Sequence, residues 1–207
     1  MRPNTVTYTP ADDDANGFGD DLQDSAAGVF TLTANNAADS LAHFVTILGN
    51  AGTNHSGKTF TLTGTDANGV AQTENMAGPN GVATVTSTKY FLTLTALVVD
   101  STTGTDSFDI GWTDDIVGPT YPLDWKSPYA ANIYVDISGT IDFDIQQTFD
   151  NVLAGDAPSW VAISALDSKT ADTYGNPAIG ATAIRLLLNS LTSGATIKIS
   201  TSQAGNM

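Results

Sequence analysis

The chain contains no cysteine, only one glutamate and no long hydrophobic run, and each absence limits what the protein can be. With no Cys among its 207 residues, the chain forms no disulfide and no thiolate metal site. The N-terminal stretch MRPNTVTYTPADDD lacks an apolar signal core. No segment approaches the roughly 20 apolar residues of a membrane-spanning helix. These features predict a protein that is made in a cytosol and has no membrane partner.

Basic residues are also scarce. The chain has 7 Lys and Arg against 22 acidic residues, which gives a formal net charge of −15. Because nucleic-acid phosphates attract proteins through Lys and Arg, this balance argues against a nucleic-acid partner. Nearly all the acid is Asp, and Glu74 is the single exception. Short Asp side chains bond to their own backbone in turns, so the acidic residues indicate turns rather than cation sites.

No catalytic or metal-binding set can be assembled from the sequence. Residues Asp12–Gly17, DDDANG, match the start of a calcium loop, but Gln23 stands where that loop needs a bidentate Glu. His43 and His55 have no Cys or Glu neighbours, which makes them a poor metal set. Neither a GxSxG nucleophile elbow nor a phosphate-binding glycine loop is present. We therefore predict a protein that is not an enzyme, with no catalytic, cofactor-binding or metal-binding residue and no cofactor.

The longest alternation of apolar and polar residues runs over residues 133–149, IYVDISGTIDFDIQQTF. Successive side chains of a strand point to opposite faces, so the pattern predicts an antiparallel sheet with one buried face. Asp142 and Asp144 fall on the solvent side of this pattern. Gly139 falls on an inward-facing position, and the apolar residues occupy the same alternate positions before and after it. This favours one long strand bent at Gly139, or a three-residue loop, over a tight two-residue turn.

Short strands separated by turns fill the rest of the chain from Val29 onward. The step Asp66–Gly69 is a turn signal, because Asn-Gly is favoured where φ is positive. YFLTLTALVVDSTTGTDSFDI and AIRLLLNSLTSGATIKI each read as a hairpin, with Gly104 and Gly194 in matching places. We predict an all-β fold of two stacked antiparallel β-sandwich modules, jelly-roll or Ig-like, over residues 28–118 and 119–207. An extended N-terminal arm, residues 1–27, precedes them; a single merged sandwich is the alternative.

Two long runs of the sequence resemble modules of structural proteins from tailed bacteriophages. They are SLAHFVTILGNAGTNHSGKTFTLTGTDANGVAQTENMAGPNG with TSTKYFLTLTALVVD, and YVDISGTIDFDIQQTFDNV with AIRLLLNSLTSGATIKIS. The resemblance implies a virion component made in the host bacterial cytoplasm. Its expected role is a capsid decoration (cement) protein that stabilises the head by binding the major capsid protein lattice. A neck, tail or fibre protein is one alternative, and a host-glycan or receptor-binding β-sandwich module is another.

The resemblance also implies partners, namely the major capsid protein or neighbouring virion proteins, and a homo-oligomer is expected. An N-terminal arm can order against a neighbour by strand addition. Trp112 and Trp160 lie on predicted strands and are assigned to the core, whereas Trp125 lies in a proline-containing segment and is kept as a contact residue. A glycan-binding module would use Trp125 with the two nearby tyrosines. The predicted interface residues are Thr5, Val6, Tyr8, Pro10, Phe18, Tyr121, Trp125 and Tyr129.

Overall fold

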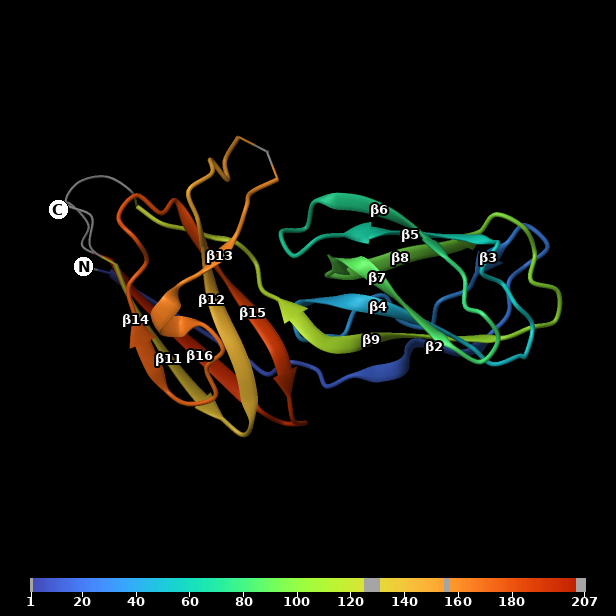
Figure 1. The fold of residues 1–207 in the computed structure, drawn as a ribbon, viewed down its shortest axis with the longest axis horizontal. Coiled ribbons are helices and arrows are strands. Elements are labelled where there is room, and N and C mark those ends of the chain that lie inside the picture. Colours follow the sequence, from blue (N-terminus) through green and yellow to red (C-terminus); the bar gives the residue numbers. More distant parts are fainter. Residues whose placement is uncertain (1, 125–130, 155–156, 204–207) are drawn as a thin grey trace. The chain divides into compact units, whose positions relative to one another are not determined.

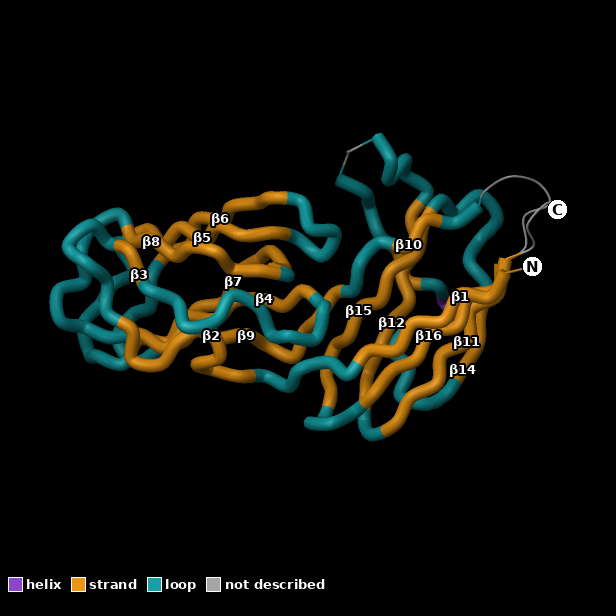
Figure 2. The backbone as a smooth tube through the Cα atoms, turned by 180° about the vertical axis from the view of Figure 1, so that it is seen from behind, coloured by secondary structure: helices purple, strands orange, loops and turns teal. Residues whose placement is uncertain are grey.

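The computed structural model describes residues 2–124, 131–154 and 157–203. These residues form an all-β protein of antiparallel sheets, as the sequence predicts, with a single 3-10 turn at Ser164–Leu166 and no α-helix among them (Figure 2). No described helix has the length and apolar character needed to cross a membrane. The chain divides into two compact units. We call Ala11–Ile116 the continuous unit, and Met1–Pro10 together with Val117–Met207 the discontinuous unit.

The continuous unit contains two sheets with a shared core. One sheet joins β2 (Asp14–Leu22), β9 (Phe108–Val117), β4 (Ala42–Gly49) and β7 (Thr84–Phe91), and the other has the order β3 (Val29–Phe30), β8 (Thr93–Val99), β5 (Thr59–Thr65) and β6 (Ala71–Ala77). Buried side chains from both sheets form one apolar cluster. In it, Phe108 packs edge-to-face on Phe30 and Phe60, with ring centroids 5.7 and 5.5 Å away. Edge-to-face packing of aromatic rings adds to the stabilisation that their burial provides.

The discontinuous unit also contains two groups of strands (Figure 1). The first sheet has the order β1 (Arg2–Tyr8), β16 (Thr196–Gln203), β11 (Ala131–Ser138) and β14 (Thr173–Gly175). The second group has β13 (Val161–Ala162), β12 (Ile141–Thr148) and β15 (Ala183–Leu191) in order, and β10 (Tyr121–Pro122) also pairs with β15. The N-terminal strand therefore belongs to the same unit as the C-terminal strand.

The long alternating segment 133–149 is two strands rather than one. β11 and β12 belong to different sheets, and residues 139–140 connect them. Ile133 and Ile141 are both fully buried, so the apolar faces of both strands point into the interior, and this preserves the phase across the connection. Gly139 has φ +87°, and a Cβ there would lie 2.9 Å from the Cβ of Ala195. This left-handed conformation and close approach require glycine.

The two predicted hairpins at Gly104 and Gly194 are wrong. β8 and β9, which flank Gly104, lie in different sheets, and so do β15 and β16, which flank Gly194. The two glycines have similar φ values, +78° and +79°. The turn at Asp66–Gly69 is confirmed as a hairpin between β5 and β6: Gly69 has φ +77° and its N–H donates to the Asp66 carbonyl at 2.9 Å.

The predicted extended arm, residues 1–27, is not confirmed. β1 pairs with β16 along its whole length, and β2 pairs with β9. Asp144 also departs from its predicted solvent-side position, because it is only 8% exposed and accepts a hydrogen bond from the Ser168 N–H at 2.5 Å. The division at residue 118 and the jelly-roll or Ig-like type stay predictions.

Candidate interaction surface

The N-terminal strand β1 forms because Thr5–Tyr8 are all β-branched or aromatic, residue types that favour strands. Val6 and Tyr8 are half-buried, whereas Thr5 and Thr7 are exposed. β1 pairs antiparallel with β16 over seven residues, and Val6 lies opposite Ile199. Cross-strand contacts between such side chains are the main source of stability in a two-stranded ladder.

β1 lies at the edge of its sheet, and β16 is its only strand partner among the described residues. The outer side of β1 therefore presents backbone N–H and C=O groups that no described strand pairs. Such an edge is a template for strand addition from another chain. On the exposed face of the ladder, the Thr5 and Ser200 hydroxyl oxygens lie 3.2 Å apart.

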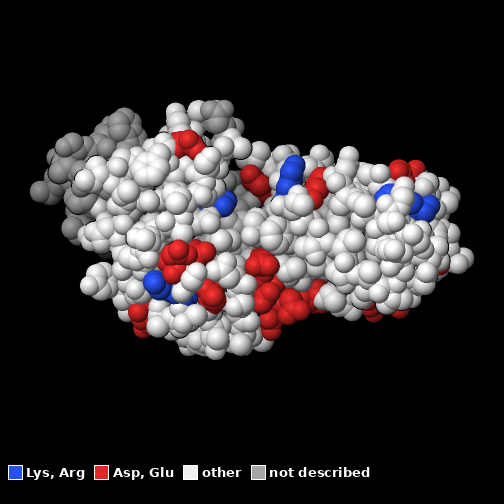
Figure 3. Space-filling view, viewed as in Figure 1, with Lys and Arg blue, Asp and Glu red and all other residues white. Residues whose placement is uncertain are grey.

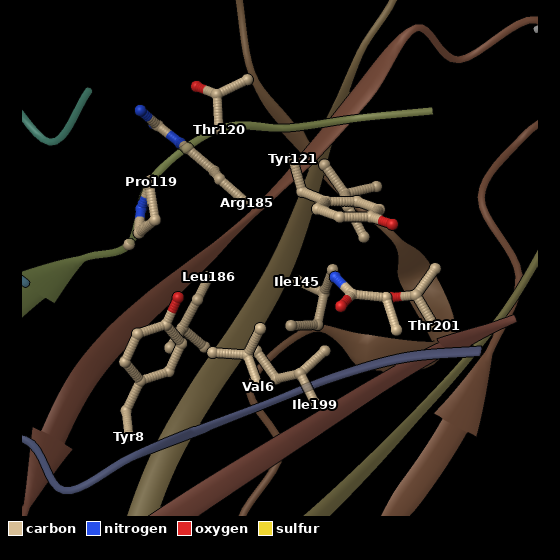
Figure 4. A pocket seen from close by; sticks show the side chains of 13 residues that line it. Val6, Tyr8, Pro119, Thr120, Tyr121, Ile145, Arg185, Leu186, Ile199 and Thr201 are labelled. Atoms are coloured by element: carbon tan, nitrogen blue, oxygen red, sulfur yellow. The ribbon is translucent and has the colours of Figure 1, made fainter. Parts of the chain in front are cut away.

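A cavity of about 140 Å³ lies beneath β1, on its inward side. Val6 and Tyr8 of β1, Tyr121 of β10 and Leu186 of β15 contribute to its lining, and Figure 4 shows these side chains around the space. Ile145 of β12 and Ile199 of β16 also line it, so both groups of strands meet there. Apolar side chains predominate in this lining, and an apolar group placed there removes apolar surface from water. The space beneath β1 therefore suits an apolar group.

Two polar side chains at this cavity have fixed environments. Burial raises the pKa of the Tyr8 hydroxyl above its usual value of 10.0, because the charged phenolate is disfavoured away from water. Arg185 donates from Nε to the Gln146 side-chain oxygen at 2.8 Å, and its guanidinium carbon lies 4.5 Å from the ring centroid of Trp160. Trp160, assigned to the core from the sequence, is half-buried and stacks against this cation.

The structure brings several predicted interface residues together. Val6, Tyr8 and Tyr121 all line the cavity, although Tyr121 lies far from the first two in sequence. Thr5 lies on the same strand as Val6 and Tyr8 but faces outward. These four residues thus form the two faces of one small region around β1.

The other predicted interface residues lie elsewhere. Pro10 is buried. Phe18 is 2% exposed in the core of the continuous unit, where its ring packs edge-to-face on Trp112 at 5.0 Å. Phe18 therefore presents no surface to a partner. Trp125 and Tyr129 lie outside the described residues.

An exposed pair of tyrosines on the β11–β14 ladder was not predicted. Tyr134 and Tyr174 lie directly opposite each other and are 44% and 77% exposed. They continue the row of facing residues that begins at Thr5 and Ser200. The available signal was Tyr134 itself, an aromatic residue at a position of the 133–149 alternation that otherwise carries polar side chains. Exposed tyrosines beside small polar residues are typical of protein-binding surfaces.

Few charges interrupt the surface of the protein. On the face drawn in Figure 3, most of the surface is neither acidic nor basic, and acidic groups outnumber Lys and Arg groups. The cores of protein–protein interfaces are depleted in charged residues. A largely uncharged surface is therefore compatible with contact to a neighbouring protein.

A buried polar network fixes the chain directly after β1. His43 is 2% exposed, with Nε2 2.9 Å from an oxygen of Asp39 and Nδ1 2.8 Å from the Thr113 carbonyl oxygen. The same Asp39 oxygen accepts a hydrogen bond from the Ala11 N–H at 2.9 Å. His43, a poor metal ligand by its sequence neighbours, is packed in the interior with Asp39 as its partner.

In the acidic N-terminal segment, the Asn16 N–H donates to the Asp14 carboxylate at 3.1 Å, within strand β2. Within the described ranges, no group of three or more His, Asp or Glu side chains is arranged to hold a metal ion. Comparison of the chain with protein-family models, curated proteins and solved structures gives no match.

Proposed function

We propose that the chain is a non-enzymatic structural protein of a tailed-bacteriophage virion, and that it acts as a capsid decoration protein. In this role it binds the major capsid protein lattice and stabilises the head. The observation that carries the proposal is β1, an N-terminal strand whose outer edge no described strand pairs, beside an exposed row of hydroxyl and tyrosine side chains. The resemblance of both long sequence runs to phage virion modules supports the same role.

The physical character of the chain suits this role. Antiparallel sheets with apolar cores provide stiffness, and a chain without cysteine needs no particular redox environment outside the cell. A shell repeats each contact many times, so a modest contact at one subunit gives stable attachment. In this proposal the two compact units are two β-sandwich modules, and β1 acts as the strand of an N-terminal arm.

The exposed tyrosines provide a test that leaves the fold intact. Tyr174→Ala removes a side chain that is 77% exposed, and Val70→Ala, at 62% exposed in the continuous unit, is the matched control. Both variants, and the unchanged protein, are added to purified particles that lack the chain. We expect the unchanged protein and Val70→Ala to bind at a fixed ratio to the major capsid protein. Particles that carry either protein should release their genome at a higher temperature than particles that lack it. Tyr174→Ala binds at least 10-fold more weakly, the equivalent of about 1.4 kcal/mol.

Failure of the unchanged protein to bind any such particle would reject the decoration role. Binding of a single ring of copies per particle, rather than of copies in a fixed ratio to the major capsid protein, indicates the alternative neck or tail role. The cavity near Tyr121 favours a protein side chain over a host glycan, because at about 140 Å³ it is smaller than typical ligand pockets of roughly 300–1,000 Å³. Specific signals on a glycan array would reverse that preference.

A further inference from the structure

We propose that β1 is exchanged between copies of this protein, so that β1 of one chain pairs with β16 of a second chain. The second copy then supplies the partner of the inner edge of β1, and its outer edge stays as described above. The exchange rests on the proposed structural role, because an assembling shell protein has neighbouring copies within reach. Its test uses purified protein without particles, so exchange and capsid binding can fail separately.

The connectivity of the chain makes such an exchange possible. β1 completes the discontinuous unit, yet the whole continuous unit lies between it and the rest of that unit in the sequence. Thr5 and Ser200, which face each other across the ladder, are 195 residues apart. β1 is thus a terminal strand that only non-covalent contacts hold to β16, since the two strands lie at opposite ends of the chain. An identical strand from another copy forms the same contacts, which is the basis of domain swapping.

Packing makes β1 easier to detach than the two central strands of its sheet, β16 and β11. It has a described strand partner on one side only, and its inward side chains Val6 and Tyr8 are half-buried over the cavity. β11, by contrast, is paired on both sides, and its Ile133 and Val135 are fully buried. Segments with few buried apolar contacts open at the lowest free energy.

The connector after β1 is short. β1 ends at Tyr8, and the Ala11 N–H is already bonded to Asp39 at 2.9 Å, so Thr9 and Pro10 alone form the connection. Proline has a restricted φ, which reduces the conformations available to this connector. A connector this short leaves β1 few ways to fold back on its own chain, and short hinge loops are where strands are exchanged between copies when the hinge is strained.

Charge and register both fit a second copy as the partner. The chain as a whole carries −15, but β1 (RPNTVTY) and β16 (TIKISTSQ) contain one basic residue each and no acidic residue. The acidic repulsion between copies is therefore absent from the two strands that would pair. A β16 edge without β1 presents Ile197 and Ile199 in alternation, and β1 places Tyr8 and Val6 opposite them.

Disulfide trapping tests the exchange, because the chain has no cysteine of its own. One chain carries Thr5→Cys and a second, isotope-labelled chain carries Ser200→Cys; the two positions are directly opposite in the ladder. The chains are mixed at about 0.15 M salt, incubated and mildly oxidised. We expect a disulfide-linked dimer that joins the two different chains, at least 5-fold above a control mixture of Thr5→Cys with Ser56→Cys. Ser56 is exposed in the continuous unit, so that mixture measures random collision.

A single chain with both Thr5→Cys and Ser200→Cys shows whether the ladder permits the bond. It must cross-link within or between chains if β1 and β16 pair as described. Complete cross-linking within monomers, together with a mixed-chain yield equal to the collision control, overturns the exchange. Absence of any cross-link in the double variant overturns the β1–β16 register, and the exchange with it.

Discussion

Replacing Asp39 by Asn should destabilise the continuous unit by about 1.5–3 kcal/mol, the typical worth of a hydrogen bond to a charged group. The Asp39 and His43 side chains are 3% and 2% exposed. The Asp39 carboxylate accepts hydrogen bonds from His43, from the Ala11 N–H and from the Leu41 N–H, at 2.9, 2.9 and 3.0 Å. The variant therefore removes the charge at the centre of three buried bonds.

The size of the effect follows from the hydrogen bonds of His43. Both ring nitrogens of His43 face oxygen atoms, one of Asp39 and the carbonyl oxygen of Thr113. Asp39→Asn replaces the charged acceptor of these hydrogen bonds by a neutral amide, and hydrogen bonds to charged groups are the stronger ones. The control is Asp136→Asn: Asp136 pairs with Lys198 at 3.2 Å, but the side chains are 41% and 45% exposed. Exposed pairs are worth roughly 0–1 kcal/mol, so the control should change little.

The pair also predicts how stability depends on pH. Burial alone would raise the pKa of Asp39, but the hydrogen bond from His43, those from Ala11 and Leu41, and the charge of His43 outweigh it and lower the pKa below its ordinary value. A carboxyl group with a lowered folded pKa stabilises the fold above its unfolded pKa of about 3.9, and this stabilisation is lost as the pH falls through the folded value. Urea unfolding followed by circular dichroism between pH 7 and pH 2 measures both effects. We expect Asp39→Asn to be less stable at pH 7 and to lose less stability in acid than the unchanged protein. A variant within 1 kcal/mol of the Asp136→Asn control at pH 7, with the same acid profile as the unchanged protein, would refute the reasoning.

Three further predictions concern the discontinuous unit. Because burial raises the pKa of Tyr8, the free energy of unfolding should fall as the pH rises above about 10. When tyrosine ionisation is followed by absorbance, the Tyr8→Phe variant should lack a component that ionises late in the titration. Gly139→Ala forces φ +87° on alanine and places its Cβ 2.9 Å from Ala195, so it should lower the free energy of unfolding in urea by about 1–3 kcal/mol. The control is Gly52→Ala, which has open space around it and should cost under about 1 kcal/mol. Leu186→Ala enlarges the cavity beneath β1 and should cost about 2–5 kcal/mol, with faster hydrogen exchange in β1; an unchanged midpoint would mean that the cavity does not exist as described.

Local patterns in the sequence predict the strands but not their partners. Alternation correctly assigns Ile133, Val135 and Ile141 to the interior, because it reports which face of a strand is buried. It does not report which sheet a strand joins. The segments around Gly104 and Gly194 therefore read as hairpins, although each crosses between sheets. That choice depends on contacts between residues far apart in sequence.

The candidate surface shows the same limit. The β-branched and aromatic residues of Thr5–Tyr8 indicate a strand, but its partner β16 lies at the other end of the chain. The Asp, Gly and Asn residues around Phe18 suggest a segment too polar to be buried, yet Phe18 packs against Trp112 in the core. The convergence of Val6, Tyr8 and Tyr121 on one cavity follows from strand pairing, which composition and periodicity do not encode.

We propose that this protein is a repeated contact element on a virion head. Electron microscopy of virions that carry a label on this chain tests it most directly. We expect label over the whole head, in the repeat of the major capsid protein lattice. Label confined to a single vertex or to the tail, or particles without any label, would contradict it.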